Sequence, residues 1–149
     1  GCSLALACDY IIAHDQASLV EVFVGIGLVL DSGSSYFLPR LVGSARAFEL
    51  ATMGSKVSAT KAAEWGMINA VVSVDELEEE TNKAAQYYAN APTLAVGMMK
   101  KMLNDSMSSS LEEVLDYEAH YQQLAGDSAD YTEGVAAFIE KRKPKFTGS

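Results

Sequence analysis

The stretches Tyr10-Ile11-Ile12-Ala13-His14 and Ala70-Val71-Val72-Ser73-Val74 decide the fold class of this 149-residue chain. Each is a short apolar run, which is typical of a buried β-strand. Helical patterns separate the two runs, and such an alternation favours parallel strands in an α/β fold. A weaker third strand is predicted over residues 18–23. Because a parallel sheet needs more strands than these, we expect an N-terminal portion of the core to precede Gly1 in the complete protein.

Helical patterns account for the rest of the first half. After a Gly/Ser-rich turn, a helix is predicted to begin near Tyr36 and to be interrupted at Pro39. A second helix over residues 44–53 ends at Gly54, and a third, over residues 58–66, begins at a serine cap.

The second half is predicted to be helical throughout. Its segments are residues 75–91, 93–106, 110–125 and 128–143. One side of the third segment carries residues of mixed polarity at helical spacing, which fits either packing on its own domain or a subunit contact. The chain therefore divides into an α/β part, residues 1–74, and a helical part, residues 75–149.

The bulk composition excludes several classes of partner. The formal net charge is −9, which argues against nucleic acid or an anionic membrane as the main partner. No apolar run reaches the roughly 18 residues that a membrane span requires. Cys2 and Cys8 are interpreted as free, buried thiols in a reducing compartment, so a cytoplasmic location is predicted.

Asp31 is the first candidate for a functional residue. It lies in the run Gly27-Leu28-Val29-Leu30-Asp31-Ser32-Gly33-Ser34-Ser35. Here an apolar segment is followed by a Gly/Ser-rich turn that carries one carboxylate. A carboxylate in apolar surroundings is poorly solvated as an anion, and such groups serve as general acids and bases. Alternatively, Asp31 caps the helix that follows the turn. The two roles are compatible, and both stay open.

Common catalytic and ligand-binding motifs are absent. Gly25 and Gly27 have the spacing of the first two glycines of a dinucleotide fingerprint, but Leu30 stands where the third should be. His14 and His120 lack partners at metal-ligand spacing, so no metal site is predicted. No serine lies in a strand–turn–helix nucleophile context. What remains is a lone acid suited to proton transfer on a bound organic substrate.

Four stretches carry the hallmarks of one family: Gly1-Cys2-Ser3-Leu4-Ala5-Leu6-Ala7-Cys8-Asp9-Tyr10-Ile11-Ile12-Ala13, Leu38-Pro39-Arg40-Leu41-Val42-Gly43, Ala62-Ala63-Glu64-Trp65-Gly66-Met67-Ile68 and Glu133-Gly134-Val135-Ala136-Ala137-Phe138-Ile139-Glu140-Lys141-Arg142. Together they resemble the crotonase (enoyl-CoA hydratase/isomerase) superfamily, and the resemblance covers essentially all 149 residues. Residues 122–131 and 144–148 are similar to its ring-epoxide isomerase branch, the 2-(1,2-epoxy-1,2-dihydrophenyl)acetyl-CoA isomerases of phenylacetate breakdown.

The resemblance implies an architecture and an assembly. Residues 1–74 would form the later part of a crotonase-type ββα spiral. Residues 75–149 would form a helical region that makes homotrimers, which commonly pair into hexamers, and that contacts CoA. No cofactor is implied, because the CoA thioester is the substrate.

Departures from the family pattern bear on the chemistry. Hydratases of this family use two glutamates, and the matching positions here are Ser3 and Phe23. Neither side chain can exchange a proton in the needed range, so hydration by that pair is not expected. Asp31 instead matches the acid that isomerases of the family carry at this turn. Glu21 would share the face of Phe23 in a strand and is interpreted as a surface or salt-bridged residue, or alternatively as a second carboxylate.

The resemblance also implies a mechanism and a set of contacts. Two backbone N–H groups would stabilise an enolate of the thioester while Asp31 moves a proton. One donor lies in an N-terminal loop of the family and the other just before Gly1, so this stretch alone is expected to be inactive. Ser3, Phe23 and Leu28 are predicted to contact the acyl group. Phe138 and Lys141 match residues that contact CoA in relatives.

Three functions are compatible with these residues. The first is an acyl-CoA isomerase that works through Asp31. The second is an enoyl-CoA hydratase with an altered acid/base set that includes Glu21. The third is a non-catalytic crotonase-like subunit.

Overall fold

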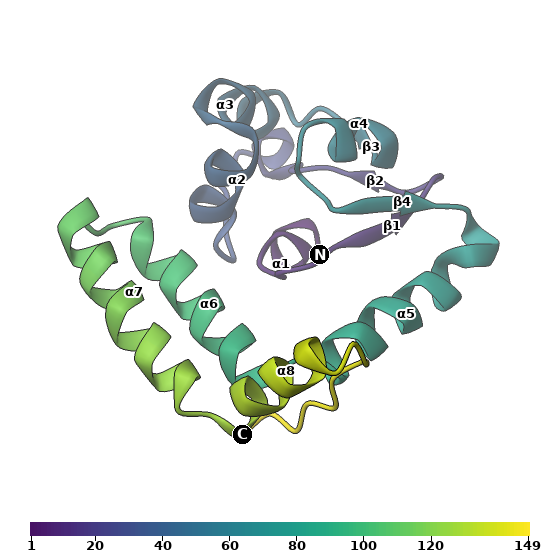
Figure 1. Ribbon diagram of the computed structural model, residues 1–149. Helices are drawn as coiled ribbons and strands as arrows, with labels where there is room; N and C mark the ends of the chain where they lie inside the picture. The colour runs from purple at the N-terminus through teal and green to yellow at the C-terminus, as the bar shows by residue number, and fades with distance from the viewer. The chain divides into compact units, whose positions relative to one another are not determined.

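Two short ladders organise the first part of the chain. In the computed structural model, which describes residues 1–149, β1 (Ile12–His14) pairs in parallel with β4 (Ala70–Val72), as Figure 1 shows. Ile12 lies opposite Ala70 in the register of this pair. The parallel pairing predicted from the alternation of strands and helices is therefore confirmed.

The second ladder corrects the predicted third strand. β2 (Ser18–Leu19) pairs antiparallel with β3 (Val57–Ser58), which offers only two partner residues. Beyond Leu19 the chain finds no further ladder and forms the 3₁₀ helix η1 (Phe23–Ile26). Gly27 ends η1 in the left-handed region, with φ of 74°. The expected strand over residues 18–23 is thus wrong after its second residue.

Four helices complete the first unit, Gly1–Asn82. They are α1 (Cys2–Leu6), α2 (Ser34–Val42), α3 (Ser44–Met53) and α4 (Ala59–Glu64). The helices and ladders bury one apolar cluster, formed by Leu6, Leu19, Leu38, Val42, Ala47, Leu50, Val57, Ala59, Ala62, Met67 and Ile68. Burial of apolar surface in this cluster supplies the main stabilisation of the unit.

The predicted interruption at Pro39 is wrong, because α2 runs through this residue. Proline cannot donate a hydrogen bond to the preceding turn. However, Leu38 and Val42 are buried in the core and hold the backbone in helical form. The carbonyl of Pro39 still accepts a bond of 3.0 Å from the Gly43 N–H. Tertiary packing therefore overrides the local preference of proline.

The ends of α3 and α4 follow the predicted chemistry. Gly54 closes α3 with φ of 61°, a left-handed conformation that glycine adopts without strain. At the start of α4, the Ser58 hydroxyl accepts a hydrogen bond from the Lys61 N–H at 3.2 Å. Both predictions are confirmed.

The remaining helices are longer. α5 (Leu77–Ala89) follows the 3₁₀ helix η2 (Val74–Glu76), where Ser73 and Glu76 form a capping box. The second unit, Lys83–Ser149, contains the end of α5 together with α6 (Thr93–Ser106), α7 (Leu111–Gly126) and α8 (Ala129–Ile139). No residue of α5, α6 or α7 is buried. No helix in the structure is both long enough and apolar enough to cross a membrane.

The C-terminal tail turns back along α8. The helix ends at Ile139 and not at the predicted residue 143, since Lys141 adopts a left-handed φ of 56°. The Arg142 guanidinium then donates two hydrogen bonds to the Glu133 carboxylate, at 2.6 and 2.8 Å. Asp130, only 4 % exposed, accepts bonds from the Thr147 N–H at 2.7 Å and the Gly148 N–H at 2.9 Å. These two carboxylates anchor the tail to α8.

Candidate functional site

The turn that carries Asp31 is built by two consecutive left-handed residues. Ser32 has φ of 49° and Gly33 has φ of 87°, and α2 begins at the next residue. The Ser34 N–H donates a bond of 3.0 Å to the Asp31 carbonyl, which closes the turn. Non-glycine residues rarely adopt positive φ, so Ser32 stores backbone strain at this turn.

Asp31 does not cap α2. Gly33 occupies the N-cap position, and no side chain accepts a bond from the first turn of the helix. The capping interpretation is therefore wrong, because the two left-handed residues separate Asp31 from the helix start. The Asp31 side chain is exposed and makes no hydrogen bond in the structure. It is available to an incoming group.

Most of the apolar side chains that precede Asp31 in the sequence are exposed to solvent. Leu28 and Val29 are 58 % and 84 % exposed, and Ile26 is also exposed. The residues predicted to surround the acid are thus beside it in sequence but do not enclose it. Phe23, predicted to contact the acyl group, lies half-buried at the start of η1. Enclosure of Asp31 in an apolar pocket stays a prediction about the complete protein.

Three buried polar side chains lie behind this turn. Ser34, the first residue of α2, is fully buried, and its Oγ lies 2.5 Å from Ser3 Oγ. The same Ser34 hydroxyl donates a bond of 3.0 Å to Glu21 Oε1. Ser3 is 3 % exposed and Glu21 is 2 % exposed. We call Ser3, Ser34 and Glu21 the buried triad.

Glu21 is the unexpected member of the buried triad. Its Oε2 is buried without a hydrogen-bond partner, and no basic side chain pairs with it. The interpretation as a surface or salt-bridged residue is therefore wrong. The argument that it shares a strand face with Phe23 also fails, because Phe23 belongs to η1. No local sequence signal places Glu21 inside, because the ladder ends at Leu19 and the burial of Glu21 depends on its distant contact with Ser34.

The thiol of Cys2 lies close enough to Glu21 for its pKa to be affected. Burial, together with the nearby Glu21 carboxyl group, raises the pKa of Cys2 to about 11. Both cysteines are free, as predicted, but Cys8 is exposed. Cys2 is only half-buried, so the prediction of two buried thiols is wrong.

The predicted CoA contacts lie in the second unit, at the end of α8. Phe138 is 85 % exposed, which leaves a large aromatic surface uncovered. Lys141 is exposed, with no ion pair to its ammonium group. Arg142, by contrast, is engaged by Glu133 and Glu140. Lys141, unlike Arg142, is therefore available to a phosphate.

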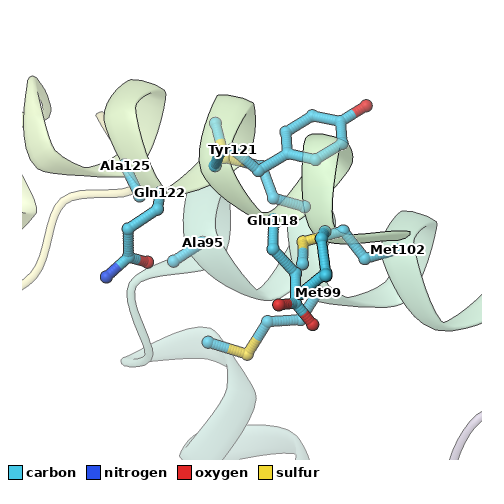
Figure 2. A pocket seen from close by; sticks show the side chains of 10 residues that line it. Ala95, Met99, Met102, Glu118, Tyr121, Gln122 and Ala125 are labelled. Carbon is cyan, nitrogen blue, oxygen red and sulfur yellow. The ribbon is translucent and has the colours of Figure 1, made fainter. Parts of the chain in front are cut away.

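A pocket between α6 and α7 is lined in part by methionines, as Figure 2 shows. It encloses about 490 Å³ and is open to solvent. α6 contributes Met98, Met99 and Met102, and α7 contributes Glu118 and Tyr121. The side of α7 with mixed polarity thus lines an open pocket, and no residue of α7 is buried, so both packing on its own domain and a subunit contact stay predictions. No group of three or more His, Cys, Asp or Glu side chains could hold a metal ion.

Comparison with known proteins agrees with this geometry. The family model described as "Enoyl-CoA hydratase/isomerase" matches residues 1–149. The chain belongs to this family. It is 45% identical over 148 residues to the 1,2-epoxyphenylacetyl-CoA isomerase of Escherichia coli (strain K12), covering 99% of this chain and 56% of that protein. It is 40% identical over 148 residues to a probable enoyl-CoA hydratase of Rhodobacter capsulatus, covering 99% of this chain and 58% of that protein.

A solved structure supports the fold of this enoyl-CoA hydratase/isomerase family member. A putative enoyl-CoA hydratase/isomerase from Mycobacterium abscessus superposes with a TM-score of 0.97 at 37% identity. The match covers 99% of this chain and 57% of that chain. The predicted crotonase-type α/β fold with a helical region is confirmed. The chain spans little more than half the length of these relatives.

Proposed function

We propose that the complete protein is an acyl-CoA isomerase in which Asp31 moves a proton on a CoA thioester. The observation that carries the proposal is the free carboxylate of Asp31, held on a closed turn without an internal partner. A general base needs an accessible oxygen in a fixed position. The relatives named 1,2-epoxyphenylacetyl-CoA isomerase and probable enoyl-CoA hydratase support a thioester substrate.

One carboxylate is enough for the proposed reaction. Asp31 takes a proton from a substrate carbon, and the electron pair of the broken C–H bond moves into the thioester as an enolate. The protonated Asp31 then returns the proton to a carbon farther along the conjugated system. Alternatively, the enolate re-forms the thioester carbonyl as a C–O bond of a strained ring breaks, and the resulting alkoxide takes the proton from Asp31. No water is added and nothing is oxidised, so the missing pair of glutamates is not needed.

Phe23 and Leu28 are proposed to contact the acyl group, and Phe138 and Lys141 the CoA moiety. Ser3, also predicted to contact the acyl group, is 3 % exposed and lies against Ser34, so its side chain does not face solvent in this structure. An ammonium group such as that of Lys141 binds phosphate as a point charge. The exposed apolar surface of α5 to α7 supports a homotrimer or a pair of trimers, because helices without buried residues gain stability by being covered. A cytoplasmic location stays a prediction from the sequence.

The test uses the protein encoded by the complete reading frame. Unsaturated acyl-CoAs are supplied, double-bond migration is followed by the absorbance of the conjugated thioester, and hydration by the mass gain of one water. We expect migration, and we expect Asp31→Asn to lower kcat by about 100- to 10,000-fold. The matched control is Asp15→Asn, which changes another exposed aspartate of the same unit and should leave kcat unchanged.

A hydratase is the second candidate, because Glu21 supplies a buried carboxylate beside Ser3. Hydration at ordinary enzyme rates that survives Asp31→Asn would favour it over the isomerase. A non-catalytic subunit is the third, and absence of turnover with every acyl-CoA tested would favour that function.

A further inference from the structure

The buried triad places a carboxyl group with one unpartnered oxygen inside the first unit. Removing a carboxylate from water without a cation nearby costs folding free energy. An apolar side chain of similar length would fill the same space at lower cost. Packing alone therefore does not explain Glu21, and buried unpaired oxygens in folded proteins call for a specific reason.

The contacts of Ser34 link the buried Glu21 to the turn that carries Asp31. Its side chain bonds to Glu21 at 3.0 Å and lies 2.5 Å from Ser3, while its backbone N–H bonds to the Asp31 carbonyl at 3.0 Å. One buried residue thus joins the triad to the turn that carries the proposed base. A carboxylate can only accept hydrogen bonds, so it fixes the direction in which the Ser34 hydroxyl points.

The turn itself needs such an anchor. Ser32 is held at φ of 49°, a conformation that costs energy for a serine and persists only where the surroundings impose it. On the helix side of the turn, the surroundings include Ser34 with its two buried partners, together with the Phe37 ring and the two N–H groups that bond to the Gly33 carbonyl. The exposed side chain of Asp31 makes no hydrogen bond that would fix it.

We propose that Glu21 is a positioning residue of the isomerase site, which acts through Ser34 to hold the Asp31 turn in its working geometry. The inference rests on the proposed function, since it assigns Glu21 a role only if Asp31 handles the proton. Small displacements of a catalytic group lower the rate of the chemical step more than they weaken binding. Loss of Glu21 should therefore lower kcat and leave KM almost unchanged.

The test compares variants of the complete protein in the migration assay. Glu21→Met fills the same space without an acceptor and should lower kcat about 10- to 100-fold. Glu21→Gln keeps an acceptor oxygen for Ser34 and should restore much of the lost rate. Ser34→Ala should cost a similar factor alone and little more when combined with Glu21→Met, because both substitutions break one link. The control Glu49→Met changes an exposed glutamate of α3 and should leave kcat unchanged.

Thermal unfolding separates positioning from a purely structural role. If Glu21 positions the turn, Glu21→Met should retain or raise the melting temperature while kcat falls, because a buried polar group with an unpartnered oxygen has been removed. A lower melting temperature with kcat within twofold of wild type would overturn the inference. Should Glu21→Met not fold, an unchanged kcat in Ser34→Ala would overturn it equally. Failure of the proposed function is distinct, since Asp31→Asn would then retain full activity.

Discussion

Replacing Asp130 with asparagine should loosen the C-terminal tail from α8. The Asp130 carboxylate is 4 % exposed and accepts the Thr147 N–H at 2.7 Å and the Gly148 N–H at 2.9 Å, one on each oxygen. Hydrogen bonds to charged groups contribute about 1.5–3 kcal/mol, against about 0.5–1.5 kcal/mol for neutral pairs. The asparagine oxygen can keep the bond from Thr147 at neutral strength. Its NH₂ group then faces the Gly148 N–H, so that bond is lost.

These changes sum to about 2–4 kcal/mol of docking free energy. The loss of docking free energy does not exceed this range, because the N–H groups of the released tail form hydrogen bonds with water. At 1.4 kcal/mol per factor of ten, the undocked population should rise about 30- to 1,000-fold.

Amide hydrogen exchange of Thr147 and Gly148 measures this population directly. Asp127→Asn is the matched control, because Asp127 is an exposed aspartate just before α8 and contacts neither amide. Exchange that accelerates less than threefold in Asp130→Asn would refute the calculation. Equal acceleration in both variants would show that overall charge, and not the two bonds, holds the tail.

Two further outcomes follow from ionisation. The Arg142 guanidinium lowers the pKa of Glu133 from 4.5 to about 2, so this pair stabilises the fold above pH 4.5 and the stabilisation is lost as pH falls through 2. Urea unfolding between pH 5 and 2 should show this loss, and a wild-type slope retained in Glu133→Gln would contradict it. Alkylation at pH 8 should modify the exposed Cys8 rapidly and Cys2 slowly, because the pKa of Cys2 is raised to about 11. Glu21→Gln should accelerate modification of Cys2, and an unchanged rate would argue against the electrostatic contribution of Glu21.

Local signals predicted the elements that depend on nearby residues. The β1–β4 pairing, the Ser58 cap and the Gly54 helix end were all accessible from apolar runs and from the conformational freedom of single residue types. The course of α2 through Pro39 was not, because it depends on burial of Leu38 against other elements. The end of α8 was missed for a similar reason, since Lys141 turns left-handed where the tail folds back.

The candidate site divides in the same way. The turn at Asp31 is visible in the sequence as glycine and serine after an apolar segment. Glu21 could not be assigned, because its burial depends on Ser34, 13 residues away, and on Ser3, which lies 31 residues from Ser34. Contacts at that separation arise only when α1 and α2 pack together. A carboxylate without a cation also contradicts the usual preference of glutamate for the surface.

The left-handed pair before α2 restricts which sequences can present an acid here. At position 33, any side chain would meet φ of 87° and also approach the Phe37 ring to 3.0 Å, so only glycine fits without rearrangement. Position 32 tolerates asparagine, aspartate or glycine in place of serine, whereas β-branched residues would clash with their own backbone. A library intended to change the reaction should therefore leave residue 33 fixed, limit residue 32 to those few types, and vary the positions proposed to contact the acyl group instead.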